Sequence, residues 1–301
     1  MAPWTRPSRG PGETGSWRQN RGVLHTERYL AGAKRAQGRL VDGLRDGAWT
    51  FWDEGGRRYA QREFRRGILD GWALGWHVKN GGRRWEVLFS HGLQEGRAVG
   101  WHELGGLHWE GEFQAGLREG AWRVHHRGGG LALEGVFGRG QREGVWRAWH
   151  PRGGMSSEVS WRRGARHGVE RRWYRSGSLR VEGDWVDGLR EGDWTEYGRG
   201  GRISSEGEYA AGLRTGAWKL MHTEGGLRAE GTVVEGLLEG WWVHYWQNGV
   251  KRAEGEMRRG RQEGPWKFWH QDGSRDREAT GIYADDQRDP GESPGNLLTG
   301  A

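Results

Sequence analysis

Hydrophobic and polar residues alternate in short runs along most of the chain, and glycines bound the runs. Alternation with a period of two over about 4–8 residues is typical of β-strands that bury one face. The runs are organised on pairs of glycines separated by three residues, and successive pairs lie 24 residues apart, with one step of 25. The pairs are Gly43/Gly47, Gly67/Gly71, Gly92/Gly96, Gly116/Gly120, Gly140/Gly144, Gly164/Gly168, Gly188/Gly192, Gly212/Gly216, Gly236/Gly240 and Gly260/Gly264. Ten pairs in one register indicate a tandem repeat.

Each repeat predicts one β-hairpin. We number its residues from the second glycine of the pair, which is position 0. Position 2 is Trp in seven of the ten repeats, and position 5 is usually aromatic. Positions 8 and 9 carry dipeptides such as Gly55-Gly56 and Asn248-Gly249, which favour a two-residue type I′ turn. A second run ends at position 17 with an aromatic or apolar residue, and a glycine-bounded loop then leads to the next repeat.

This turn fixes the expected pairing of the two strands, because residues whose positions sum to 17 then face each other. Position 2 therefore lies opposite position 15 of the same hairpin, where Trp122 covers Gly135. The residues assigned to this structural repeat are Trp122, Trp146, Trp194, Trp218, Trp242, Trp266, Gly135, Gly183, Gly207, Gly231 and Gly255.

The same register predicts cross-strand ion pairs between positions 3 and 14. They are Arg123–Glu134, Arg147–Glu158, Arg171–Glu182, Lys219–Glu230 and Lys267–Glu278. One face of the sheet is expected to carry the Trp at position 2, the strand glycine, the aromatic at position 17 and the leucines at position 11. The opposite face is expected to carry the ion pairs and the aromatic residue at position 5.

The pattern predicts an all-β fold, an elongated single-layer sheet of about eleven tandem hairpins built from 24-residue repeats. An eleventh, degenerate hairpin fits upstream of the ten, with its turn at Ala31-Gly32 and its strand glycine at Gly38. The repeat array is expected over residues 23–286, between a disordered basic tail at residues 1–22 and a disordered C-terminal tail at residues 287–301.

Two stretches carry a family resemblance. The segments "EGEFQAGLREGAW" (110–122) and "EGEYAAGLRTGAW" (206–218) resemble MORN repeats. The preference for Trp at position 2 and an aromatic at position 5 is closer to the bacterial MORN-variant repeat, found in proteins labelled as antitoxins of toxin–antitoxin systems. The resemblance implies a β-repeat scaffold with a protein-binding role, as the antitoxin-like member of a toxin–antitoxin pair.

Composition narrows the function classes. The chain has 301 residues, with 58 Gly, 22 Trp and no Cys, and only 34% of its residues are hydrophobic. The lack of Cys excludes disulfides and thiolate metal sites. The net charge of +7 comes from interleaved basic and acidic residues, so nucleic acid is not an expected partner. The sequence shows no signal peptide and no membrane span, and a cytoplasmic location is expected.

The candidate catalytic and metal-binding residues all follow the repeat. Six histidines occupy position 6, at His77, His102, His126, His150, His222 and His270. Equivalent positions on successive hairpins lie about 10 Å apart, which is too far for two imidazoles to share one zinc ion. Glutamate at position 14 recurs in the same way. We therefore expect no catalytic residues, no metal and no cofactor, and a chain that is not an enzyme.

The aromatic residues at position 5 form the candidate binding surface: Trp76, Trp101, Trp149 and Trp173. A row of rings at intervals of about 10 Å suits an extended protein partner, such as a toxin. The alternative function is a module that binds carbohydrate or cell-envelope polymers through Trp stripes. Arginines at position 12 could instead stack on these rings, leaving no need for a ligand. Self-association through the Trp/Gly face is a further hypothesis, because a lone sheet buries little apolar surface.

Overall fold

A computed structural model describes residues 22–289 of the chain. Its 23 strands belong to one antiparallel sheet in which strands that follow one another in sequence form hairpins, so the predicted all-β fold of eleven hairpins is confirmed. The residues divide into two compact units that meet between Leu93 and Gln94. The tails expected at residues 1–22 and 287–301 lie mostly outside the described residues. The array nevertheless continues past residue 286, because β23 (Gln287–Arg288) pairs with the preceding strand.

The strands of unit 1 are β1 (Val23–Arg28), β2 (Lys34–Val41), β3 (Leu44–Trp52), β4 (Arg58–Arg65), β5 (Ile68–Trp76) and β6 (Arg83–Ser90).

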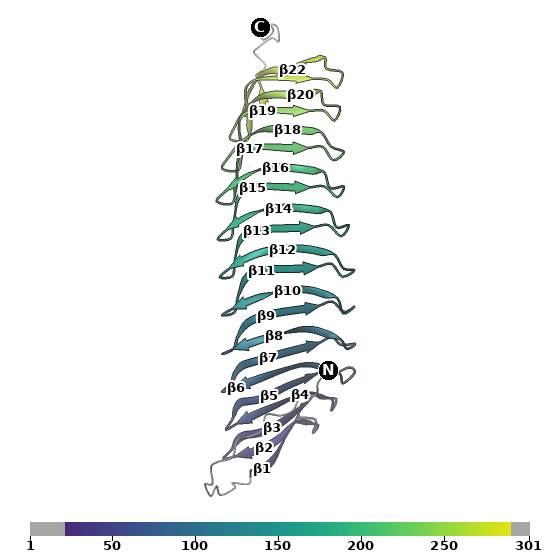
Figure 1. The fold of residues 1–301 in the computed structure, drawn as a ribbon, viewed down its shortest axis with the longest axis vertical. Helices are drawn as coiled ribbons and strands as arrows, with labels where there is room; N and C mark the ends of the chain where they lie inside the picture. The colour runs from purple at the N-terminus through teal and green to yellow at the C-terminus, as the bar shows by residue number, and fades with distance from the viewer. Residues whose placement is uncertain (1–21, 290–301) are drawn as a thin grey trace. The chain divides into compact units, whose positions relative to one another are not determined.

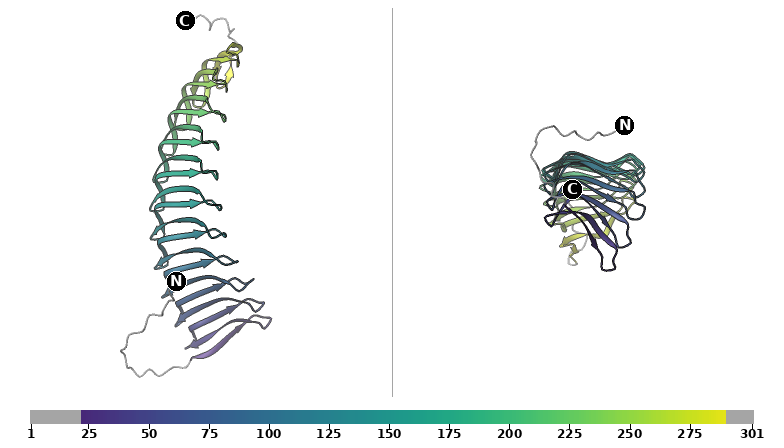
Figure 2. Two further views of the ribbon diagram at one scale, coloured as in Figure 1. Left: turned by 45° about the vertical axis from the view of Figure 1, so that its right-hand side comes forward. Right: turned by 90° about the horizontal axis from the view of Figure 1, so that it is seen from below.

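Unit 2 contains the remaining hairpins, which follow one another in a single layer (Figures 1 and 2). Its strands are β7 (Leu93–Trp101), β8 (Leu107–Gln114), β9 (Leu117–His125), β10 (Leu131–Gly138), β11 (Gln141–Trp149), β12 (Met155–Arg162), β13 (Ala165–Trp173), β14 (Leu179–Val186), β15 (Leu189–Tyr197), β16 (Ile203–Ala210), β17 (Leu213–Met221), β18 (Leu227–Val234), β19 (Leu237–Tyr245), β20 (Lys251–Arg258), β21 (Arg261–Trp269), β22 (Arg275–Ala284) and β23.

The turn is one residue longer than predicted in ten of the eleven hairpins, and two residues longer in the β5–β6 hairpin, where the single 25-residue step occurs. In the β11–β12 hairpin, the amide of Gly153 donates to the carbonyl of His150, and the amide of His150 donates to the carbonyl of Gly154. Gly153 at position 9 has a φ of 88°, but Arg152 at position 8 does not have a positive φ, which is typical of a three-residue loop rather than of a type I′ turn. A bulge at position 12 compensates, because Ser156 is skipped between the pairs Trp149–Met155 and Ala148–Ser157.

The type I′ turns lie instead between successive hairpins, where a loose glycine-bounded loop was expected. After β10, Arg139 and Gly140 have φ of 51° and 79°, and Gly138 pairs directly with Gln141. A non-glycine residue with positive φ recurs at this place, as at Ala115 and Ala211. The first glycine of each pair therefore completes a tight turn, and the next three residues already belong to the following strand.

The register beyond the bulge is the predicted one. Position 2 pairs with position 15 and position 3 with position 14, as in Trp122–Gly135 and Arg123–Glu134. Ion pairs join Arg123, Arg147 and Arg171 to the expected glutamates at Nε–O distances of 3.6, 2.8 and 3.6 Å. Lys219 pairs in register with Glu230, but its Nζ lies 3.6 Å from Glu206 of the preceding hairpin.

The predicted pair Lys267–Glu278 is wrong. The strand β22 is ten residues long and irregular, so that Phe268 pairs with Asp276 and Trp266 with Gly281. These additional residues shift Glu278 out of the register, and Lys267 Nζ instead lies 4.0 Å from Glu254.

The Trp at position 2 joins each hairpin to the one before it. A Cβ added to Gly135 would overlap the ring of Trp146, although Trp122 is the residue paired with Gly135 in its own hairpin. The indole of Trp146 also donates to the carbonyl of Val136, 3.1 Å away in the preceding hairpin. The expectation that each Trp covers the glycine of its own hairpin was therefore wrong: the ring leans across the strand boundary and covers the earlier glycine.

We call the face that carries these rings the Trp face. Alternating T-shaped contacts run along it, including Phe137 against Trp122 and Trp146 at centroid distances of 5.9 and 4.9 Å. The arginine at position −2 stacks on the same rings, as Arg142 does 4.5 Å from the centre of the Trp146 ring. The six tryptophans at position 2 of unit 2 are only 1–5% exposed. These rings are thus buried within a single chain. The self-association hypothesis had assumed that a second chain would cover them.

Candidate functional site

The recurring phrase "GLREG" is explained by the fold. Its first glycine closes the type I′ turn, and its arginine, such as Arg118, stacks on the Trp at position 2, 4.8 Å from the ring centre of Trp122. Its glutamate holds the next turn: Glu119 Oε2 accepts from the amide of Arg139 at 2.7 Å. Its second glycine has positive φ, 67° at Gly120, where the strand bulges. The two glycines, the arginine and the glutamate of the phrase thus each have a structural role.

The face opposite the Trp face carries a row of apolar side chains. Because the bulge at position 12 reverses the alternation, position 11 pairs with position 5, as in Trp149–Met155 and Trp173–Leu179. The leucines at position 11 therefore lie on this face, and their predicted place beside the Trp at position 2 was wrong. We call the row in unit 2 the stripe; it consists of Trp101, Leu107, His125, Leu131, Trp149, Met155, Trp173, Leu179, Tyr197, Ile203, Met221 and Leu227.

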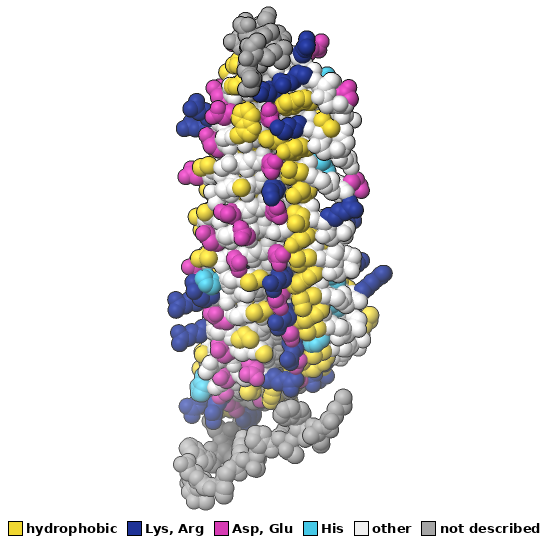
Figure 3. Space-filling model, turned by 45° about the horizontal axis from the view of Figure 1, so that its top comes forward, with side chains coloured by type: hydrophobic (Ala, Val, Ile, Leu, Met, Phe, Trp, Pro, Cys, Tyr) yellow, Lys and Arg dark blue, Asp and Glu magenta, His cyan; other side chains and the backbone are white. Residues whose placement is uncertain are grey.

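The stripe is continuous and partly exposed. Eleven of its side chains are half-buried and Ile203 is exposed. In Figure 3 it runs as a yellow column beside a column of alternating blue and magenta, which contains the charged residues at positions 3 and 14. Along that column, Arg171 lies 3.6–3.8 Å from both Glu182 and Glu158. A partly exposed apolar row beside charged side chains that pair with one another has the make-up of a macromolecular contact surface.

The four candidate tryptophans do not share one environment. Trp101, Trp149 and Trp173 belong to the stripe of unit 2 and are half-buried. Trp76 lies in unit 1, is 8% exposed, and has Arg58 and Arg83 stacked at 3.9 and 5.1 Å from its ring centre. The expected alternative, an arginine covering the ring, thus holds for Trp76, although Arg58 stands at position 11 rather than 12.

Position 6 forms a ladder between hairpins. The Nε2 atoms of His102 and His126 lie 2.9 and 3.0 Å from the carbonyl oxygens of His125 and Trp149, each at position 5 of the next hairpin. Tyr174 and Trp246 make the same contact through their OH and Nε1 groups. These side chains lock the turn edge of the sheet. Within residues 22–289, no group of three or more His, Asp or Glu side chains could hold a metal ion.

Sequence reasoning missed a second apolar row on the stripe face. The leucine at position −3 lies next to the inward-facing arginine at −2 and so points to the opposite face. In unit 2 this leucine row consists of Leu117, Leu189, Leu213 and Leu237, each 49–51% exposed. The signal was present in the "L" of "GLREG", which recurs at an alternating position where a polar residue would be expected.

Two tyrosines join the stripe face to the ion-pair ladder. Tyr245 OH donates to Glu230 Oε1 at 2.8 Å, and Tyr197 OH donates to Glu182 Oε1 at the same distance. Burial and then the hydrogen bond to Glu230 raise the pKa of Tyr245 to about 12. Burial and Glu182 likewise raise the pKa of Tyr197. On the Trp face, burial and the nearby Arg252 and Arg228 lower the pKa of His244.

The comparisons with known proteins identify the repeat. The family model described as "MORN repeat variant" matches residues 166–187, which include most of β13 and all of β14. This supports the resemblance to MORN repeats and, with it, a repeat scaffold. No curated protein matches the chain. None of the elements described between residues 22 and 289 is a helix long and apolar enough to cross a membrane.

Several solved structures show a weak likeness. The crystal structure of TcdB2-TccC3 is 11% identical, with a TM-score of 0.20, over 88% of this chain and 16% of that chain. The Tc holotoxin pore of Photorhabdus luminescens is 12% identical, with a TM-score of 0.18, over 82% of this chain and 16% of that chain. Alternansucrase in complex with isomaltononaose is 12% identical, with a TM-score of 0.18, over 83% of this chain and 20% of that chain. The chain thus spans a fifth or less of these proteins, and such TM-scores support no functional inference.

Proposed function

We propose that this chain is a non-enzymatic scaffold that binds a protein partner along its stripe face. The observation that carries the proposal is the stripe itself, twelve partly exposed side chains in unbroken order on unit 2. Position 5 aromatics are not needed for the joints between hairpins, which depend on the Trp at position 2 and the side chain at position 6. Partly exposed aromatic rows with a charged border are typical of protein interfaces.

The leucine row provides a second contact line on the same face. Leu189 and Leu213 are each 51% exposed, and the ion-pair ladder lies between this row and the stripe. A partner that spans both rows would meet apolar residues at two edges and charges in the middle. The paired charges set the register of such a partner more than its affinity.

The antitoxin-like role implied by the family resemblance is the finer form of this proposal. It requires the partner to be toxic when produced alone, and the scaffold to occlude it by binding along the stripe. The expected place of action is the cytoplasm.

The test is affinity purification of the tagged chain from its native host, with mass spectrometry of what co-purifies. Trp149→Ser/Trp173→Ser removes two rings of the stripe, and Leu104→Ser is the control, because Leu104 is 92% exposed in the turn between β7 and β8 and belongs to neither apolar row. We expect one stoichiometric protein with the wild type and its loss with the stripe variant. Retention by the stripe variant contradicts the proposed surface, and recovery of polysaccharide in place of protein supports the carbohydrate-binding alternative.

A further inference from the structure

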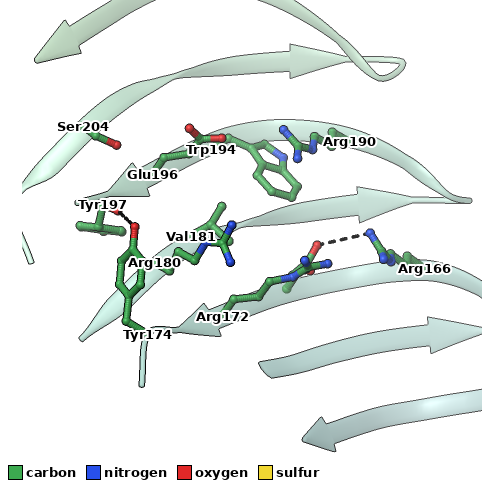
Figure 4. A pocket seen from close by; sticks show the side chains of 11 residues that line it. Arg166, Arg172, Tyr174, Arg180, Val181, Arg190, Trp194, Glu196, Tyr197 and Ser204 are labelled. Carbon is green, nitrogen blue, oxygen red and sulfur yellow. Dashed lines mark hydrogen bonds and ion pairs between the residues drawn. The ribbon is translucent and has the colours of Figure 1, made fainter. Parts of the chain in front are cut away.

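One repeat of unit 2 departs from the others on the Trp face. Position 2 of the β13–β14 hairpin is Glu170, where the neighbouring hairpins have Trp146 and Trp194. Glu170 is 1% exposed, so its carboxylate occupies a place that elsewhere holds an indole. The smaller side chain leaves a cavity of about 290 Å³ (Figure 4).

A second departure adjoins the first. Position 6 of the next hairpin is Gly198, so the ring that elsewhere bridges to the following hairpin is missing. A hollow of about 640 Å³ lies there, and Tyr174, Tyr197 and Ser204 line both spaces. The repeat thus loses two of its linking side chains at neighbouring places, and both losses open space.

The cavity at Glu170 is rich in guanidinium groups. Arg166, Arg172, Arg180 and Arg190 line it together with Glu170 and Glu196, so four positive charges meet two negative ones and leave a formal +2. Figure 4 shows the four arginines, which come from β13, β14 and β15. No other side chains in its lining carry a formal charge at neutral pH.

The Glu170 carboxylate is already satisfied. Arg172 Nε donates to its Oε1, Trp185 Nε1 donates to its Oε2 at 2.5 Å, and Arg166 Nη1 lies 3.8 Å from Oε2. By contrast, Arg180 and Arg190 form no ion pair with an acidic side chain among residues 22–289. Arg180 stacks on Tyr174 at 5.8 Å. Arg190 donates to the Tyr209 hydroxyl at 2.9 Å and stacks on Trp194, 4.3 Å from its ring centre, as the other arginines at position −2 do, so its charge is met by rings and a hydroxyl but by no carboxylate.

Stability does not explain this arrangement. Burying a carboxylate with its partners costs free energy that a well-packed apolar group avoids. The chain contains the apolar solution in the adjacent hairpins, at Trp146 and Trp194. Glu170 holds Arg172 and Arg166 at the wall of the cavity and prevents an indole from filling it.

We propose that this cavity binds a small soluble oxyanion, a phosphate- or carboxylate-bearing molecule. Arg180 and Arg190 supply the unpaired guanidinium groups, whose planar N–H forks match these anions. The Ser204 hydroxyl is a further donor at the wall. A volume of about 290 Å³ is at the lower end of ligand pockets and suits a molecule of metabolite size. The proposal does not depend on the protein-binding stripe, with which the lining of the cavity shares one residue, Tyr197.

Calorimetric titration with inorganic phosphate and, separately, with malonate at low salt tests the site. Arg180→Ser removes one unpaired guanidinium, and serine already occupies position 12 at Ser156 and Ser204. Arg252→Ser is the matched control, because Arg252 is also at position 12, stacks on Trp246 at 4.9 Å and carries the same charge. We expect one saturable site with at least one of the two anions in the wild type and in the control, weakened about 10-fold or more by Arg180→Ser. Equal weakening in both variants, or no saturable binding of either anion to the wild type, overturns the proposal.

A second variant closes the cavity without removing an arginine. Val159→Gly/Glu170→Trp recreates the pair formed by Gly135 and Trp146, because Val159 pairs directly with Glu170. We expect an unchanged circular dichroism spectrum, no loss of thermal stability and no anion binding. Anion binding retained by this folded variant contradicts the site. Sedimentation with phosphatidylcholine vesicles that contain phosphatidic acid distinguishes the source: binding there without binding of free anions refutes a small-molecule site.

Discussion

On the Trp face of unit 2 the aromatic residues are closed in, whereas on the stripe face they remain partly open. Trp146 is 4% exposed, donates to a carbonyl of the preceding hairpin and has an arginine stacked on it. Trp149, three residues later in the same strand, points to the other face, is half-buried and pairs with Met155. The same residue type therefore joins neighbouring hairpins at one position and lies partly open to solvent at the other, where we propose a contact surface.

This difference shows which side chains stabilise a single-layer repeat sheet. A single layer has no second sheet to pack against, so each hairpin must be fixed to its neighbours by side chains that cross the strand boundary. The Trp face supplies that through rings, glycines and arginines. The apolar pairs of the stripe face lie within one hairpin, so they do not join neighbouring hairpins to each other.

The largest expected effect is the loss of a Trp-face ring. Trp146→Ala removes a buried indole and its hydrogen bond, and we expect the free energy of unfolding to fall by about 3–5 kcal/mol. Trp149→Ala in the same strand should cost markedly less, because its ring is already partly in water. Urea denaturation followed by circular dichroism measures both. Equal losses for the two variants would show that the faces do not differ in the way described.

A glycine on the Trp face is the next most sensitive position. Gly135→Ala places a methyl group inside the Trp146 ring, and we expect a loss of about 1–3 kcal/mol from overpacking. In the double variant Gly135→Ala/Trp146→Ala the cost of the alanine at 135 should nearly vanish, which a double-mutant cycle measures. Gly128→Ala is the control, since nothing lies within 4 Å of its added Cβ and its φ is not positive. If the losses of the two single variants simply add in the double variant, the methyl group at 135 does not clash with the Trp146 ring.

The hairpins and most of the strand register could be predicted from the sequence. Two features were missed, the longer turn and the bulge at position 12, and their effects on the register cancel. The turn is one residue longer than the dipeptides suggested, and the bulge at position 12 skips one residue, so the register is correct again at position 13 and beyond. The ion pairs used to check the register all lie beyond the bulge and could not reveal it. The pairing of position 5 with position 11, and hence the composition of the stripe, depends on the bulge and was lost with it.

The partner of each Trp was readable in the sequence but was assigned to the wrong hairpin. Every Trp at position 2 is preceded, eleven residues earlier, by glycine: Gly38, Gly111, Gly135, Gly183, Gly207, Gly231 and Gly255. Where position 2 is Ala73, Ala98 or Glu170, that earlier residue is Arg62, Val87 or Val159. Exposure, in contrast, could not be derived from the pattern. It depends on side chains from neighbouring hairpins, as Arg58 over Trp76 shows.

The two faces should also lose stability at opposite ends of the pH scale. His244 lies on the Trp face between Trp242 and Trp266, with ring centroids 6.2 Å from each. Because burial lowers its folded pKa below the ordinary value of 6.5, the folded state resists protonation. Stability is therefore present above pH 6.5 and falls as the pH drops below it. His244→Phe, which places the residue found at Phe268 in the next hairpin, should flatten this fall in denaturation midpoints between pH 7 and about 5.

The smallest expected effect is at the alkaline end, on the stripe face. Tyr245 is neutral when it donates to Glu230, and its folded pKa of about 12 exceeds the ordinary value of 10. Its contribution to stability is thus complete below pH 10 and disappears as the pH rises to about 12. Tyr245→Phe should remove that part of the pH dependence and leave the acid side unchanged. Since lysines and the other tyrosines titrate in both proteins, the difference between the two denaturation curves isolates this side chain. A difference that does not change between pH 9 and about 12 would mean that the hydroxyl is not held by the carboxylate, and that the stripe face is looser than its hydrogen bonds imply.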